Sequence, residues 1–154
     1  MKRLTFSITR KDEIMVQLAS KANHKTVALW AIDCAERVMP YFEEIYPQDH
    51  RPRHAIETLK TWIDTGIFTM AGIRKASLDS HAAARDVGED SAARSAARAA
   101  GQAVATAHVP RHAYGAAIYA QQAIYRSTNV LDVVERERNW QYQHLLYLRE
   151  QYEI

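Results

Sequence analysis

Residues 91–127 read SAARSAARAAGQAVATAHVPRHAYGAAIYAQQAIYRS, and the architecture of the whole chain is best approached from this alanine-rich stretch. Between Ala82 and Ala123, 17 of the 42 residues are alanine, the residue with the highest helix propensity. Pro110 interrupts the pattern, and proline is tolerated in the first turn of a helix but not in its interior. The stretch therefore predicts two helices, at about 91–108 and about 110–127, joined by a short turn.

Both predicted helices carry a face of small side chains, because their alanines recur at spacings of three and four residues. Arg94, Arg98 and Gln102 share the opposite face of the first helix. Gly101 lies in the interior of that helix, where glycine costs about 1 kcal/mol relative to alanine. We expect Gly101 to permit the close approach of another helix. The two small-residue faces predict that these helices pack tightly together in the middle of the molecule.

Apolar periodicity predicts five more helices, at about 10–22, 25–46, 52–65, 70–86 and 130–152. Thr9, Thr69 and Asn129 are the expected N-caps of three of them, and Gly66 follows the end of another. Pro40 is expected to kink the helix in which it lies.

The fold prediction is an all-α, single-domain bundle of about seven helices that covers residues 1–154. The loops are short, as between antiparallel neighbours, and the alanine-rich helix hairpin lies at the centre. A short solenoid of stacked helix pairs is the alternative architecture.

Composition excludes several classes of protein. The 154 residues include 20 basic and 18 acidic side chains, which is too balanced for a nucleic-acid-binding footprint. No apolar run approaches the ~20 residues that span a bilayer, so no membrane association is expected. The single cysteine, Cys34, precludes an intrachain disulfide and fits a reducing compartment.

Known catalytic signatures are absent from the sequence, so we expect no catalytic residues, no cofactor and no metal. Cys34 lies on an apolar helix face and is interpreted as an inert core thiol. The alternative is a metal-binding or hydrolytic helical bundle. It would use a histidine group, and bundles do build such sites from inward-facing side chains. Its candidate residues are His81, His108, His112 and His144.

A protein-binding surface is the other candidate site, because arginine is enriched at protein interfaces. Asp33 and Arg37 can pair along one helix at i, i+4 or contact a partner. Arg51 and Arg53 flank Pro52 at a helix N-terminus, where they oppose the helix dipole. The predicted partner-binding residues are Asp33, Arg37, Arg51, Arg53, Arg85 and Arg111.

Three blocks of the sequence resemble a family of small all-helical immunity proteins of bacterial polymorphic-toxin systems. They are ALWAIDCAERVMPYFEEIYPQDHRPRHAIET, AARAAGQAVATAHVPRHAYGAAIYA and ERERNWQYQHL, within the region from Lys25 to Arg149. The resemblance implies a cytoplasmic protein that binds and neutralises a cognate toxin without catalysis, and it assigns no contact residues. A self-associating regulatory or scaffolding bundle, and hence a homo-oligomer, is a further alternative.

Overall fold

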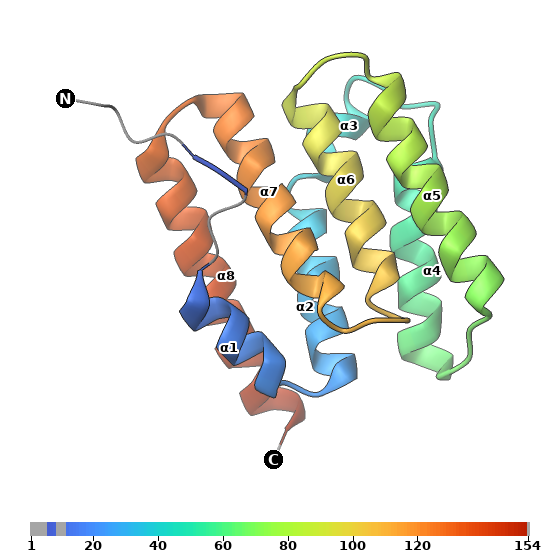
Figure 1. Cartoon of the computed structure of the whole chain (residues 1–154), viewed down its shortest axis with the longest axis vertical. Helices are drawn as coiled ribbons and strands as arrows, with labels where there is room; N and C mark the ends of the chain where they lie inside the picture. The colour runs from blue at the N-terminus through green and yellow to red at the C-terminus, as the bar shows by residue number, and fades with distance from the viewer. Residues whose placement is uncertain (1–5, 9–11, 154) are drawn as a thin grey trace.

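The computed structural model describes residues 6–8 and 12–153, and these residues form eight α-helices and no strand (Figure 1). The all-α prediction is therefore confirmed. The helices are α1 (Glu13–Lys21), α2 (His24–Glu36), α3 (Met39–Glu43), α4 (Arg51–Thr65), α5 (Met70–Asp86), α6 (Ala92–Ala105), α7 (His112–Thr128) and α8 (Leu131–Tyr152).

The alanine-rich helices α6 and α7 form the most extensive helix–helix contact of the described residues, as their small-residue faces predict. α5, α6 and α7 lie side by side in one layer, with α2 and α4 behind them (Figure 1). α6 contacts α2, α3, α4, α5 and α7. In a solenoid each repeat contacts only its neighbours in the chain. Because α6 contacts five other helices, the architecture is a bundle and not a solenoid.

Large side chains from the surrounding helices complete the core. Trp30, Leu59 and Leu145 are fully buried, and they come from α2, α4 and α8. Trp30 Nε1 also donates a hydrogen bond of 2.9 Å to the backbone oxygen of Gln141. Because an indole N–H buried without an acceptor is unfavourable, this bond fixes how α2 lies against α8.

The predicted helix at about 25–46 is divided into two helices. α2 ends at Glu36 and α3 begins at Met39, so the chain changes direction before Pro40 is reached. Pro40 lies in the first turn of α3, where a missing backbone donor removes no helical hydrogen bond. The sequence predicted one helix kinked at Pro40, and the structure instead has two separate helices, with Pro40 near the start of the second.

Local capping signals are partly confirmed. Thr69 accepts a hydrogen bond from Gly72 N and caps α5, and Gly66 ends α4 with a φ of 73°. Asn129 is not the N-cap of α8, because it takes the left-handed conformation and ends α7. The predicted cap at Thr9 lies outside the described residues. No described helix is both long and apolar enough to cross a membrane.

Candidate functional site

Arg51 and Arg53, two of the predicted partner-binding residues, are engaged in ion pairs between helices. Arg51 contacts Asp49 at 2.7 Å and Asp86 at 2.8 Å, which links the start of α4 to the end of α5. Arg53 pairs with Glu43, in α3, at 2.6 Å and also with Glu36. Hydrogen bonds from Arg53 hold the pKa of Glu43 below its usual value. Both arginines therefore connect structural elements.

Asp33 and Arg37 have separate partners on α8. Arg37 makes a bidentate contact of 2.8 Å with Glu137, which is 4% exposed. His144 Nε2 donates to Asp33 at 2.7 Å. The i, i+4 pair between Asp33 and Arg37 that the helix spacing allows is thus replaced by two links between α2 and α8.

Arg85, Arg98 and Arg111 differ from these arginines, because none of them has a carboxylate partner among residues 6–8 and 12–153. Arg98 Nη1 instead donates a hydrogen bond of 2.9 Å to His81 Nδ1, which joins α6 to α5. On the other side of α6, His112 Nδ1 contacts Gln102 Oε1 at 2.9 Å. We call this surface the cationic face, and it consists of His81, Arg85, Arg98, Gln102, Arg111 and His112.

Two glycines make room for the side chains of the cationic face. A Cβ atom on Gly101 would lie 2.7 Å from His81 Nε2, and one on Gly115 would lie 2.6 Å from Gln102 Oε1. Neither separation is possible for real atoms, so His81 and Gln102 occupy the space of absent methyl groups. Gly101 does permit a close approach, as expected, but its neighbour is the His81 ring rather than the alanine face of α7.

Burial and neighbouring cations keep the two histidines of the face neutral. Burial lowers the pKa of His81 to about 4, with Arg98, Arg85 and His112 acting in the same direction. Burial, Arg111 and His108 lower the pKa of His112. Because arginine only donates, His81 Nδ1 must be the acceptor in its bond with Arg98. At neutral pH the positive charge of the face therefore comes from its arginines.

The low pKa of His81 predicts that acid destabilises the protein. An unfolded histidine has a pKa near 6.5, so between this pH and about 4 the unfolded chain takes up a proton at His81 and the folded protein does not. The contribution of neutral His81 to the free energy of unfolding is therefore complete above pH 6.5 and is lost as the pH falls towards about 4. We expect the free energy of unfolding of the wild type to fall, relative to that of a His81→Gln variant, by roughly 2 kcal/mol over this range. Urea unfolding at several pH values measures the difference. Identical pH slopes for both proteins would contradict the assignment.

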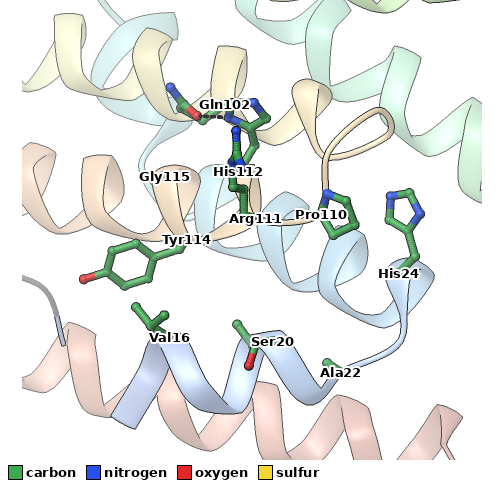
Figure 2. Close-up of a pocket in the computed structure, with 11 residues that line it drawn as sticks. Val16, Ser20, Ala22, His24, Gln102, Pro110, Arg111, His112, Tyr114 and Gly115 are labelled. Atoms are coloured by element: carbon green, nitrogen blue, oxygen red, sulfur yellow. Dashed lines mark hydrogen bonds between the residues drawn. The ribbon is translucent and has the colours of Figure 1, made fainter. Parts of the chain in front are cut away.

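A pocket of about 630 Å³ opens at one end of the cationic face, between α1 and the start of α7. Figure 2 shows Val16 and Ser20 on α1, and Arg111 and Tyr114 on the α7 side. The described residues that line the pocket are Val16, Ala19, Ser20, Ala22, His24, Gln102, Pro110, Arg111, His112, Tyr114 and Gly115. Most of these side chains are apolar or uncharged, and Arg111 carries a permanent positive charge.

The four predicted histidines do not converge on one site. His81 and His112 belong to the cationic face, and His108 lines a small hollow with Met70 and Leu78. His144 stacks on Trp140, with ring centroids 4.6 Å apart, on α8. Within the described ranges, no three histidine, cysteine or acidic side chains are grouped so that they could hold a metal ion.

Cys34 is fully buried, and burial raises the pKa of its thiol well above the ordinary value. A thiol with a raised pKa is a poor nucleophile because its reactive thiolate form is scarce. The structure thus places Cys34 in the core, as the sequence indicates.

Sequence reasoning did not include Arg98 and Gln102 in the site, or the pocket beside them. The available signal was the polar stripe opposite the alanines of α6. That stripe does not reveal that α5 and α7 cover it only in part, or that Gly115 makes room for Gln102.

These features define an all-α protein whose distinctive surface is a group of arginines with no carboxylate partners beside a largely apolar pocket. Residues 17–147 match the family model described as Imm-5 like putative immunity protein. The chain belongs to this immunity protein family, and membership of the family supports a general role in immunity. Searches of curated proteins and of solved structures returned no match.

Proposed function

We propose that this protein binds a cognate bacterial toxin in the cytoplasm and neutralises it by forming a stoichiometric complex, without catalysis. Membership of the immunity protein family supports a toxin partner in general terms. The cationic face is the proposed toxin-binding surface, and the toxin surface that it contacts is acidic.

The observation that carries this proposal is the contrast between two sets of arginines. Arg37, Arg51 and Arg53 are engaged with carboxylates of their own chain. Arg85 and Arg111 have no such partner in the described part of the chain. Arg85 lies on α5 and Arg111 directly precedes α7, and both helices belong to the same layer (Figure 1). Complementary charges accelerate association and exclude wrong partners, and arginine is prominent among residues that dominate binding energy.

The rigidity of the underlying layer favours binding through the same surface. α5, α6 and α7 are joined by Ser80 Oγ, which donates to Ala97 O at 2.8 Å, and by the fully buried alanines of α6 and α7. A surface on such a support loses little conformational freedom on binding, and this reduces the entropic cost of complex formation.

Charge reversal on the cationic face is expected to weaken toxin binding. Arg85→Glu and Arg111→Glu should each raise the dissociation constant by about 10- to 100-fold, because each replaces an attraction with a repulsion. Isothermal titration calorimetry would use the purified toxic domain against which co-expression of this protein protects a host cell. The same variants should lose protection when they are co-expressed with that domain.

Arg136→Glu is the matched control for these variants. Arg136 is an exposed residue of α8 without a carboxylate partner among the described residues, and its reversal changes the net charge equally. We expect this variant to bind and protect like the wild type. Equal weakening by all three reversals would mean that net charge, not the cationic face, governs binding. A wild-type protein that forms no complex with the toxic domain would contradict the proposed function.

A further inference from the structure

We propose that the pocket between α1 and α7 receives an apolar side chain of the toxin, carried on a segment whose carboxylates lie against Arg111. This inference rests on the proposed function and specifies the chemistry of its partner: an acidic segment with an apolar or aromatic anchor residue.

The dimensions and lining of the pocket fit such an anchor. Its volume of about 630 Å³ is within the range of ligand clefts. Val16, Ala19 and Ala22 provide an apolar wall on the α1 side, and Pro110 and Gly115 lie on the α7 side. A buried anchor side chain that fills a pocket of this kind contributes more binding energy than the surrounding polar contacts.

The charges around the pocket select an acidic segment. Arg111 has no carboxylate partner among the residues described, and none of the eleven lining residues is acidic. His112, whose pKa is lowered chiefly by burial, is neutral at neutral pH, so the attraction for a carboxylate comes from Arg111. A carboxylate of the toxin therefore gains an attraction at the rim and meets no repulsion from the lining, whereas a basic segment would be repelled by Arg111.

The pocket is continuous with the cationic face. Gln102, Arg111 and His112 belong both to that face and to the pocket lining, and Gln102 is bonded to His112 there (Figure 2). A toxin that covers the face must therefore also cover the mouth of the pocket. The face and the pocket together match a common interface pattern, in which an apolar anchor is surrounded by polar contacts.

A bulky side chain in the pocket tests this inference directly. Ser20 is an exposed residue of α1 that lines the pocket, and its hydroxyl donates to the backbone oxygen of Gln17. Ser20→Trp should fill part of the pocket and raise the dissociation constant of the toxic domain by at least about 10-fold. Gln17→Trp places the same side chain on an exposed, non-lining position of α1 and should bind like the wild type.

The outcomes separate the pocket from the function as a whole. Circular dichroism and thermal unfolding establish that both variants fold. If Ser20→Trp binds as tightly as Gln17→Trp while Arg111→Glu weakens the complex, the pocket holds no anchor, but the immunity function stands. If Ser20→Trp leaves toxin affinity unchanged and instead abolishes a dimer seen by light scattering, a second copy of the chain occupies the pocket and the inference is wrong. If the wild type itself does not bind the toxic domain, the proposed function fails.

Discussion

Replacement of Arg37 with alanine is expected to lower the free energy of unfolding by about 3 kcal/mol, because it leaves the carboxylate of Glu137 buried without its cation. Glu137 is 4% exposed, and Arg37 supplies both of its charged hydrogen bonds at 2.8 Å. The guanidinium of Arg37 also lies 3.8 Å from the ring centre of Trp140, so the variant loses this stacking as well. Chemical unfolding of the purified variant measures the change.

A double variant distinguishes two causes of the lost stability: the buried, unpaired carboxylate of Glu137, and the lost packing of the Arg37 side chain. When Arg37 and Glu137 are both replaced by leucine, no ion remains in the interior, and most of the lost stability should return. If the double variant is as unstable as Arg37→Ala, packing by the arginine stem, rather than its charge, holds α2 against α8. If Arg37→Ala unfolds at the same denaturant concentration as the wild type, the ion pair makes no contribution.

Replacement of Ala100 with leucine is the second change with a large expected effect. Ala100 is fully buried in α6, the helix on which α2, α3, α4, α5 and α7 all pack. The three added heavy atoms have no space there, so neighbouring helices must separate or adopt strained rotamers. We expect a loss of about 3 kcal/mol in the free energy of unfolding, at the upper end for overpacking in a core.

Ala105→Leu is the matched control, because Ala105 lies at the end of the same helix and is half-buried. A change of less than about 0.5 kcal/mol is expected there, since surface substitutions rarely have larger effects. Similar losses for the two variants would show that α6 tolerates bulk equally along its length and is not the tightly packed centre of the bundle.

The features that the sequence predicts are those with local causes. Thr69 and Gly66 signal helix ends through their own chemistry, and the small-residue faces of α6 and α7 identify the pair of described helices with the most extensive contact. The break between α2 and α3 was harder to predict. Pro40 indicates a disturbance, but the direction of α3 depends on its packing against α6.

Long-range pairings had no signal in a single sequence. Arg37 and Glu137 are 100 residues apart, and Asp33 and His144 are 111 residues apart. Asp33 and Arg37 instead suggested a pair with each other, because helix periodicity reveals only neighbours within one helix. The presence of α8 beside them is a property of the assembled bundle.

The sequence predicted that arginines would form the candidate site, but it did not predict which arginines lie together on one surface. Arg85 and Arg111 were expected to contact a partner, and the structure leaves both without a carboxylate in the described ranges. Arg51 and Arg53 were also predicted to contact a partner, and in the structure nearby acidic residues pair with both of them. Which arginines stay unpaired depends on where Asp86, Glu36 and Glu43 lie after folding, so composition alone could not separate the two sets.

The most direct test of toxin binding through the cationic face is a cross-saturation measurement by nuclear magnetic resonance. Deuterated protein would be mixed with the protonated toxic domain, and each backbone amide signal would be followed while the toxin is irradiated. We predict that the largest intensity losses occur around His81, Arg98 and Arg111, in the layer formed by α5, α6 and α7. Losses confined to α2 and α8 around Asp33 and Tyr147, with the cationic face unaffected, would contradict the account.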